Sequence, residues 1–310
     1  MSVPAVVAMG GPLTGVAHMF GHPFVRYAFL AGSTVAVAAG IAGYFLVLRA
    51  QVFTADALSH VAVAGAMAAL AFGVDPRLGL FAATVAVAVG MGVLGPRGRP
   101  DDVVIGSVFA WILGLGVLFL SLYTRSRSTG NGTAGITVLF GSLFGLSPSR
   151  AVTAAAVSAA TAVLLLLIAR PLLFATVDEA VARARGLPVT ALGLGFLALA
   201  GVTAAEATQV VGALLLLGLV AAPAGAAYHL TDRPYRALGL SAALALAAMW
   251  SGLGLSYAVP WLLPSFAVIA VASLIYLLAV TLGGLWSDSE RNPPDLDAST
   301  RHPPKRPPSP

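Results

Sequence analysis

The chain alternates between long apolar segments and short polar loops. Nine segments are long enough to cross a bilayer as helices, which takes about 17–25 predominantly apolar residues. We predict these helices at 27–48, 57–73, 77–95, 103–123, 150–169, 188–205, 209–229, 237–257 and 261–283. A tenth apolar stretch, 136–148, is too short to span, and its glycines and final proline favour a re-entrant helix. The predicted fold class is all-α, a polytopic membrane protein with about nine transmembrane helices.

The two ends of the chain depart from this pattern. Residues 1–26 form an N-terminal arm that lacks the basic start of a signal peptide, since the first arginine is Arg26. A transmembrane domain over 27–285 follows. Residues 286–310 are rich in proline and polar side chains, and we predict a disordered tail because such a composition cannot bury a core.

Composition narrows the possible functions. Hydrophobic residues make up 58% of the chain and charged residues 9%, whereas soluble domains are about a quarter charged. The absence of cysteine excludes disulfides, thiolate metal ligands and cysteine nucleophiles. The net charge of +5 comes from arginines scattered over the loops, which does not indicate nucleic-acid binding.

The arginines also predict how the chain lies in the membrane. Loops on one side hold eight of them, namely Arg49, Arg97, Arg99, Arg170, Arg183, Arg185, Arg233 and Arg236. The opposite side holds five, namely Arg26, Arg77, Arg125, Arg127 and Arg150. Because the more basic side is normally cytoplasmic, we expect the N-terminus outside and the tail inside.

The segment "TADALSH" places an acid and a histidine where a membrane helix is expected to begin. Asp56 and His60 are four residues apart, so on a helix they share one face. Carboxylate and imidazole are both ligands for Zn²⁺ and other first-row divalent ions, and carboxylate also suits Mn²⁺. Alternatively, Asp56 caps the helix and His60 is an interfacial polar residue. Ser59 either supports the pair with its hydroxyl or bonds to the helix backbone.

Three further polar groups have alternative interpretations. "VDEAVARARG" at 177–186 reads as a short helix with Asp178 and Glu179 in its first turn, Arg183 and Arg185 in its last, and Gly186 as its stop. It is either a solvated loop helix or a docking element for a cytosolic partner. His18 and His22 are also four apart and could collect metal near the entrance, but the intervening Gly21 and the following Pro23 favour a loop. Glu206 and Gln209 are expected in a solvated outer turn, the alternative being a docking contact for an extracellular binding protein.

Six motifs in order resemble one known family. They are "GYFLVLRAQVF", "DALSH", "DDVVIG", "LFGSLFGLSPSR", "VDEAVARARGLPV" and "QVVGALLLLGLVAAPAGAAYHL". This order resembles the permease subunits of bacterial ABC importers for zinc, manganese or iron, which are related to the vitamin B12 and siderophore permeases. The chain departs from the usual pattern at Ala55, where glycine is common, at "SPSR" in place of "SPED", and at Gly225 in place of alanine.

The resemblance implies a type-II ABC importer permease fold in the bacterial plasma membrane. It implies that Asp56 and His60 bind the transported ion, with Ser59 beside them, and that two permease copies join their pairs at a two-fold axis. Small residues on the same helix, Ala62, Ala64, Gly65 and Ala68, would then allow close approach of the copies. Pro223 is expected to break a helix along the pathway.

The resemblance also implies partners. Asp178, Glu179, Arg183, Arg185 and Gly186 would form the coupling helix for a cytosolic ATPase subunit, and an extracellular or periplasmic binding protein would deliver the ion. The chain has no phosphate-binding G-x-x-x-x-G-K-[ST] loop, and its single lysine, Lys305, lies in the tail. Membrane lipid is a further expected partner, and no intrinsic cofactor is expected. The expected transported ion is zinc or manganese, with iron also compatible.

Two other function classes remain open on the sequence. One is a stand-alone, ion-coupled secondary transporter, which would use acids inside the membrane but usually shows internal repeats that are not evident here. The other is an intramembrane enzyme, for which the chain lacks the H-E-x-x-H zinc-protease motif. Only a pairing of Ser142 with His60 could be imagined for it.

Overall fold

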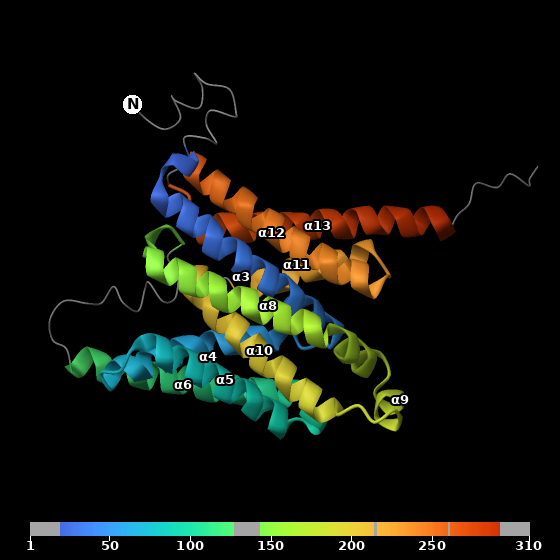
Figure 1. The fold of residues 1–310 in the computed structure, drawn as a ribbon, viewed down its shortest axis with the longest axis horizontal. Helices are drawn as coiled ribbons and strands as arrows, with labels where there is room; N and C mark the ends of the chain where they lie inside the picture. Colours follow the sequence, from blue (N-terminus) through green and yellow to red (C-terminus); the bar gives the residue numbers. More distant parts are fainter. Residues whose placement is uncertain (1–18, 127–142, 214–215, 260, 292–310) are drawn as a thin grey trace, which may run out of the picture.

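The computed structural model describes residues 19–126, 143–213, 216–259 and 261–291, and every regular element in these ranges is helical (Figure 1). The helices are α3 (Pro23–Leu48), α4 (Val52–Ala71), α5 (Pro76–Leu94), η1 (Pro96–Gly98), α6 (Asp102–Ser126), η2 (Leu143–Gly145), α8 (Pro148–Val177), α9 (Glu179–Ala184), α10 (Val189–Val210), α11 (Leu216–Leu230), α12 (Pro234–Ala258) and α13 (Pro264–Arg291).

The all-α membrane fold predicted from the sequence is confirmed. Within the described residues, eight helices are long and apolar enough to cross a membrane, and α11, at 15 residues, is shorter. Each of the nine predicted segments corresponds to one helix. The re-entrant segment 136–148 lies mostly outside the described residues, which take in only η2 and the start of α8. Residues 1–18 and 292–310 also lie outside them, and α13 continues past the predicted domain end to Arg291.

Residues 170–187, which separate two of the predicted membrane helices, are largely helical. Helix α8 runs through Pro171 to Val177, and α9 follows after the single residue Asp178. Interior proline normally interrupts a helix, but Leu172, Leu173 and Ala175 beyond it are buried against neighbouring helices. Burial of these apolar side chains therefore extends the helix past the point where the sequence suggested a loop.

Helix α3 is the centre of the bundle. It packs against α8, α12, α11 and α10, while α4, α5 and α6 pack together as a second group (Figure 1). Helix α10 joins the two groups, since it contacts α5 and α4 as well as α8 and α3. The short helix α9 lies at one end of the bundle, where α8 ends and α10 begins (Figure 1).

Small residues bring α4 and α5 into close contact within one chain. A Cβ atom at Gly65 would lie 2.5 Å from the backbone oxygen of Gly79, and one at Gly79 would lie 2.3 Å from the oxygen of Gly65. Ala62 packs in a cluster with α5 and α10, and Ala64 in one with α6. Ala62, Ala64 and Gly65 are thus buried inside the chain, so the prediction that they allow close approach of two copies is wrong. Ala68 is half-buried, and for it the prediction stays untested.

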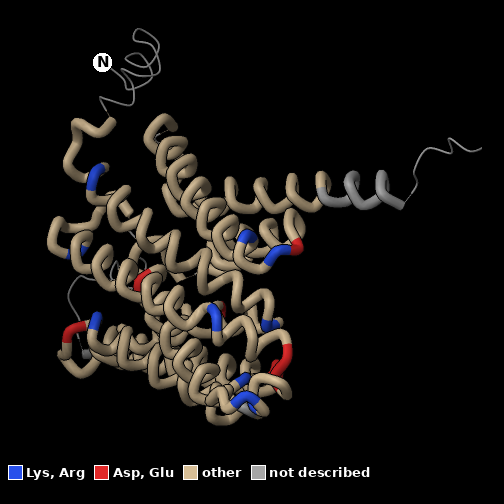
Figure 2. The backbone as a smooth tube through the Cα atoms, turned by 45° about the vertical axis from the view of Figure 1, so that its right-hand side comes forward, with Lys and Arg blue, Asp and Glu red and all other residues tan. Residues whose placement is uncertain are grey.

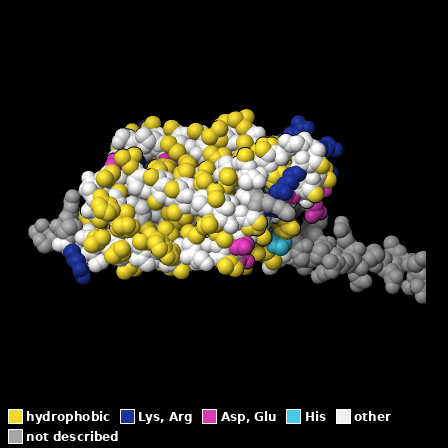
Figure 3. Space-filling model, turned by 90° about the horizontal axis from the view of Figure 1, so that it is seen from below, with side chains coloured by type: hydrophobic (Ala, Val, Ile, Leu, Met, Phe, Trp, Pro, Cys, Tyr) yellow, Lys and Arg dark blue, Asp and Glu magenta, His cyan; other side chains and the backbone are white. Residues whose placement is uncertain are grey.

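The surface has the character of a membrane protein. Helices α5 and α6 expose many large apolar side chains, among them Leu78, Val103, Trp111 and Val117. Viewed from below, the molecule presents a face covered mainly by hydrophobic side chains (Figure 3). Most charged residues lie instead at the two ends of the helices (Figure 2). The chain is therefore a polytopic membrane protein, as predicted.

Contacts between loops show which loops lie together at each end of the bundle. Gln51 bonds to Pro100, and Arg99 pairs with Glu179, so the loops after α3 and α5 share one end with α9. Arg77 bonds to Gln209 and Thr153 at the other end. The loops that meet at each end are those that the arginine count assigned to the same side of the membrane.

Candidate metal site and coupling surface

Helix α4 carries the acid and histidine of "TADALSH". A tight turn over Arg49–Gln51 precedes it, in which Ala50 takes a left-handed backbone with φ of 55°. The helix begins at Val52, five residues earlier than predicted. At 1.5 Å per residue, Asp56 lies about 6 Å and His60 about 12 Å along the helix from its first residue. Both residues are therefore inside a membrane helix rather than at its start.

One stripe of α4 is left partly uncovered by the rest of the chain. Phe53, Asp56, His60 and Val63 recur at intervals of three and four residues and are exposed or half-buried, while Leu58 and Val61 are fully buried. The His60 imidazole contacts the Phe109 ring of α6 edge-on, with 5.1 Å between centroids. The acid and the histidine thus share an open face of the helix.

The Ser59 side chain points elsewhere. It is fully buried, and its hydroxyl donates a 2.7 Å hydrogen bond to the backbone oxygen of Asp56. Of the two interpretations that the sequence left open, this geometry fits the backbone bond. The contribution of Ser59 to the pair is consequently indirect, through the backbone of the helix turn.

The pair supplies too few ligands to hold an ion alone. Within the described residues, no group of three or more His, Asp, Glu or Cys side chains is arranged to hold a metal. One carboxylate and one imidazole leave half of a tetrahedral, or most of an octahedral, coordination sphere open. Further ligands would have to come from water, backbone or a second protein chain facing the open stripe.

Helix α9 is built as its sequence predicts, although shorter. Its N-cap is Asp178, whose carboxylate accepts a 2.9 Å hydrogen bond from the Val181 amide. It ends at Ala184, and Gly186, two residues further on, has a φ of +80°, the left-handed conformation that favours glycine after a helix. Arg183 and Arg185 are exposed, and so are the apolar Val177 and Val181. Glu179, by contrast, is turned toward the bundle.

A cavity of about 570 Å³ opens beside this helix. It lies between the end of α8, the end of α9 and the start of α12. Phe174 and Val177 give it an apolar wall, while Arg170, Arg185 and Tyr235 add polar groups. Together with the exposed side chains of α9, the cavity makes up the candidate coupling surface.

The structure corrects two further sequence predictions. Helix α11 runs through Pro223, so no helix break occurs there. The helical structure instead ends between α10 and α11, where Gly212 has a φ of +106°. Glu206 lies in α10 and is only 4% exposed, whereas a solvated turn was expected. Packing of α10 against α5 and α8 buries this position, which a single sequence does not reveal.

Sequence reasoning missed three residues beside the candidate sites, Gln51, Arg99 and Phe109. Arg99 pairs with Glu179, Phe109 contacts His60, and Gln51 is the N-cap of the helix that carries Asp56. The signal for Arg99 was its place in the short basic loop before α6. The signal for Phe109 was its position about two turns into the helix that follows "DDVVIG".

Comparison with known proteins identifies the family. Residues 21–283 match the family described as "ABC 3 transport family". The chain belongs to the ABC 3 transport family. It is 28% identical over 267 residues to "Manganese transport system membrane protein MntC" of Halalkalibacterium halodurans, covering 84% of this chain and 88% of that protein. To "Chelated iron transport system membrane protein YfeC" of Yersinia pestis it is 28% identical over 236 residues, covering 76% and 78%.

A solved structure shares the fold. The chain superposes on a chain of "PsaBC from Streptococcus pneumoniae in complex with Fab" with a TM-score of 0.73 and 22% identity. The match covers 85% of this chain and 93% of the other. As a member of the ABC 3 transport family, the chain is a membrane transport protein, and the resemblance inferred from the six motifs is confirmed.

Proposed function

We propose that this chain is the membrane-spanning permease of an ATP-driven importer of a divalent metal ion. The observation that carries the proposal is the Asp56–His60 pair, two metal-ligand side chains on an open stripe of a membrane helix. Ionisable side chains within membrane helices are rare and mark ion or substrate pathways, since an aspartate at the centre of such a helix costs about 2.5–3.5 kcal/mol on insertion scales. Family membership agrees with this role.

The cargo we favour is Mn²⁺ or Fe²⁺. Relatives named for manganese and for chelated iron support these ions, whereas the sequence alone pointed to zinc or manganese. A site of carboxylate and imidazole suits either ion, because carboxylate favours Mn²⁺ and imidazole binds iron. Weak, partial coordination is also what import needs, since the ion has to leave as readily as it arrives.

A second permease copy would complete the site. Two copies related by a two-fold axis would bring together two Asp56 carboxylates and two His60 imidazoles, giving four ligands. The uncovered stripe over Phe53, Asp56, His60 and Val63 supports this arrangement. The small residues first expected at the axis are occupied inside the chain, so the stripe itself would line the interface.

The permease is proposed to work with two other proteins. A cytosolic ATPase subunit would dock on the coupling surface, where Val181 and Arg185 are exposed beside the 570 Å³ cavity. An ion-capturing protein would bind at the opposite end. The sequence lacks a nucleotide-binding loop, so ATP hydrolysis would be carried out by the ATPase subunit. A stand-alone secondary transporter is disfavoured, because family members belong to ABC systems.

Metal accumulation in cells tests the proposal directly. Cells that lack only this chain should lose uptake of manganese or iron, measured element by element, and regain it with the wild-type chain. Purified chain should also co-purify with the ATPase encoded for the same transporter. Uptake that continues without any ATPase would instead support the secondary transporter.

A further inference from the structure

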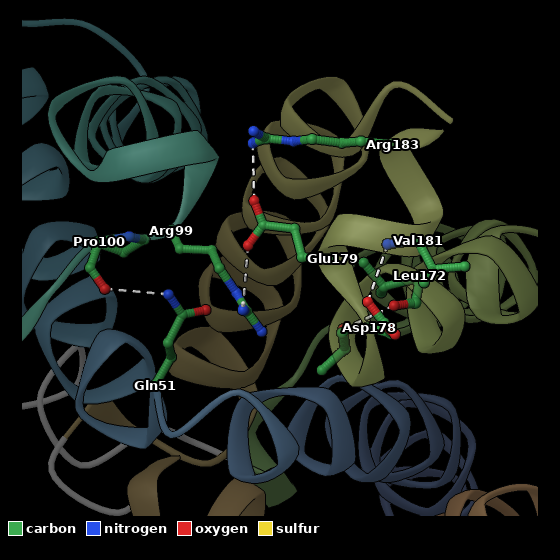
Figure 4. A network of polar contacts seen from close by, with 9 residues as sticks. Gln51, Arg99, Pro100, Leu172, Asp178, Glu179, Val181 and Arg183 are labelled. Carbon is green, nitrogen blue, oxygen red and sulfur yellow. Dashed lines mark hydrogen bonds and ion pairs between the residues drawn. The ribbon is translucent and has the colours of Figure 1, made fainter. Parts of the chain in front are cut away.

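Glu179 faces its own bundle although it belongs to the helix proposed to meet the ATPase. Its carboxylate lies 2.8 Å from the Arg183 guanidinium, four residues on, and 4.0 Å from the Arg99 guanidinium (Figure 4). Its side chain is only 19% exposed. Arg99 comes from the loop before α6, so the second ion pair joins two separate parts of the fold.

A second arginine depends on the same carboxylate. The Arg49 guanidinium is buried over the Phe196 ring of α10, 5.2 Å from its centroid, and its Nε and Nη1 atoms have no hydrogen-bond partner among the described residues. Burial, with a smaller contribution from repulsion by Arg99, lowers the pKa of Arg49 to about 10, and attraction to Glu179 opposes this shift. Glu179 is thus the acid that balances two neighbouring arginines.

These charges sit where both helices of the proposed metal site begin. Gln51, the N-cap of α4, donates a 3.1 Å hydrogen bond from Nε2 to the Pro100 oxygen (Figure 4). Asp101, the next residue, accepts a 2.8 Å hydrogen bond from the Val104 amide at the start of α6. Five residues after Gln51 comes Asp56 on α4, and on α6 Phe109 touches His60.

We propose that Glu179 is a positioning residue that transmits movement of α9 to the Asp56–His60 pair through Arg99 and the loops that start α4 and α6. This inference rests on the proposed function, and it assigns Glu179 to the permease interior rather than to the ATPase contact. When α9 moves with the ATPase, the Glu179 carboxylate pulls on Arg99. The Pro100–Gln51 bond then carries the displacement to the helix that holds the ion ligands.

Removing the carboxylate should uncouple ATP hydrolysis from transport. In Glu179→Gln the size of the side chain is kept but the charge is lost, so Arg49 and Arg99 repel each other without an intervening acid. Sites that are coupled through such contacts typically show an effect of about 5–150-fold. We expect the ratio of metal transported to ATP hydrolysed to fall at least about fivefold, with the ATPase still bound.

The experiment uses the full transporter reconstituted in vesicles with Mn²⁺ as the probe. It compares the wild type, Glu179→Gln, Arg99→Gln and the double variant for ATPase co-purification, ATP hydrolysis and Mn²⁺ uptake. Arg183→Gln is the matched control: it removes the ion pair within α9 but keeps the one to Arg99. We expect Glu179→Gln, Arg99→Gln and the double variant to lower the transport ratio by similar factors, because all three remove the same Glu179–Arg99 ion pair.

Three outcomes would overturn the proposal. These are an unchanged transport ratio in Glu179→Gln, strictly additive effects in the double variant, or loss of the ATPase from Glu179→Gln but not from Arg183→Gln. The last would assign Glu179 to docking. Should Glu179→Gln fail to insert, Arg99→Gln removes the same pair from the other side and decides the question. A wild-type chain that binds no ATPase would instead refute the proposed function itself.

Discussion

His60 meets the ring of Phe109 edge-on, with 5.1 Å between ring centroids and 72° between the ring planes. This contact joins α4 to α6 and limits how the imidazole can turn. An aromatic pair of this kind contributes about 0.5–1.5 kcal/mol beyond the burial of its area. Phe109 therefore holds a proposed metal ligand in place without binding the ion itself.

Replacing Phe109 should weaken transport without abolishing it. In Phe109→Ala the imidazole loses its packing partner. If the lost aromatic contact energy of about 0.5–1.5 kcal/mol weakens ion binding, the ion concentration needed for half-maximal uptake should rise about 2- to 12-fold. Phe109→Tyr keeps the ring and serves as the control. Concentration-dependent Mn²⁺ uptake in vesicles measures both variants; equal values for alanine and tyrosine would remove Phe109 from the site.

Loss of either proposed ligand should be more severe. Asp56→Ala and His60→Ala each leave one ligand per chain, and we expect uptake of the transported ion to fall more than about tenfold. The variants should insert normally and keep the ATPase, as shown by membrane fractionation and co-purification. Wild-type accumulation of every candidate metal in both variants would refute the site.

Ser59→Ala distinguishes the two roles considered for that hydroxyl. Because the hydroxyl donates to the Asp56 backbone oxygen, its loss should change uptake less than about twofold, as an i−3 side-chain bond adds little to a helix. A tenfold loss in the same uptake assay would instead indicate that Ser59 supports an ion ligand directly.

Cysteine cross-linking tests the shared site. The chain has no native cysteine, so Phe53→Cys and Val63→Cys on the open stripe provide unique thiols. If two copies meet along this stripe, oxidation should give homodimers in native membranes, because disulfides need Cα atoms within about 7 Å. Ser59→Cys, on the buried side of α4, is the control and should stay monomeric. If neither Phe53→Cys nor Val63→Cys gives dimers in any nucleotide state, the shared site is refuted.

A glycine contact brings the backbone of α5 close to α4, the helix that carries the site. In Gly79→Ala the added methyl group would meet the Gly65 backbone oxygen at 2.3 Å, so α4 and α5 must separate. Overpacking of this kind costs about 1–3 kcal/mol. Gly90→Ala on the same helix is the matched control, since nothing lies within 4 Å of its added carbon. Thermal unfolding in detergent should show a lower midpoint for Gly79→Ala only; equal midpoints would contradict the contact.

Much of this protein follows from local sequence. The lengths of the apolar runs predicted nine membrane helices, and within the described residues eight helices are long and apolar enough to cross a membrane, while α11 is shorter. Such runs form helices because a lipid-exposed backbone must make its own hydrogen bonds, and a helix does so within one segment. The spacing of Asp56 and His60 placed both on one helix face, since that depends only on 3.6 residues per turn. Asp178 and Gly186 bounded α9 for equally local reasons.

Tertiary packing decided which face of each helix is covered. Alanine and glycine occur on every face of α4. Its sequence therefore does not distinguish Gly65, which packs on α5, from a residue at an interface between copies. In water a polar face would reveal the outer side of a helix, but in lipid both the covered and the uncovered faces are apolar. Glu179 turns inward toward Arg99 because segments distant in sequence meet at one end of the bundle. Only the folded bundle brings these charges together.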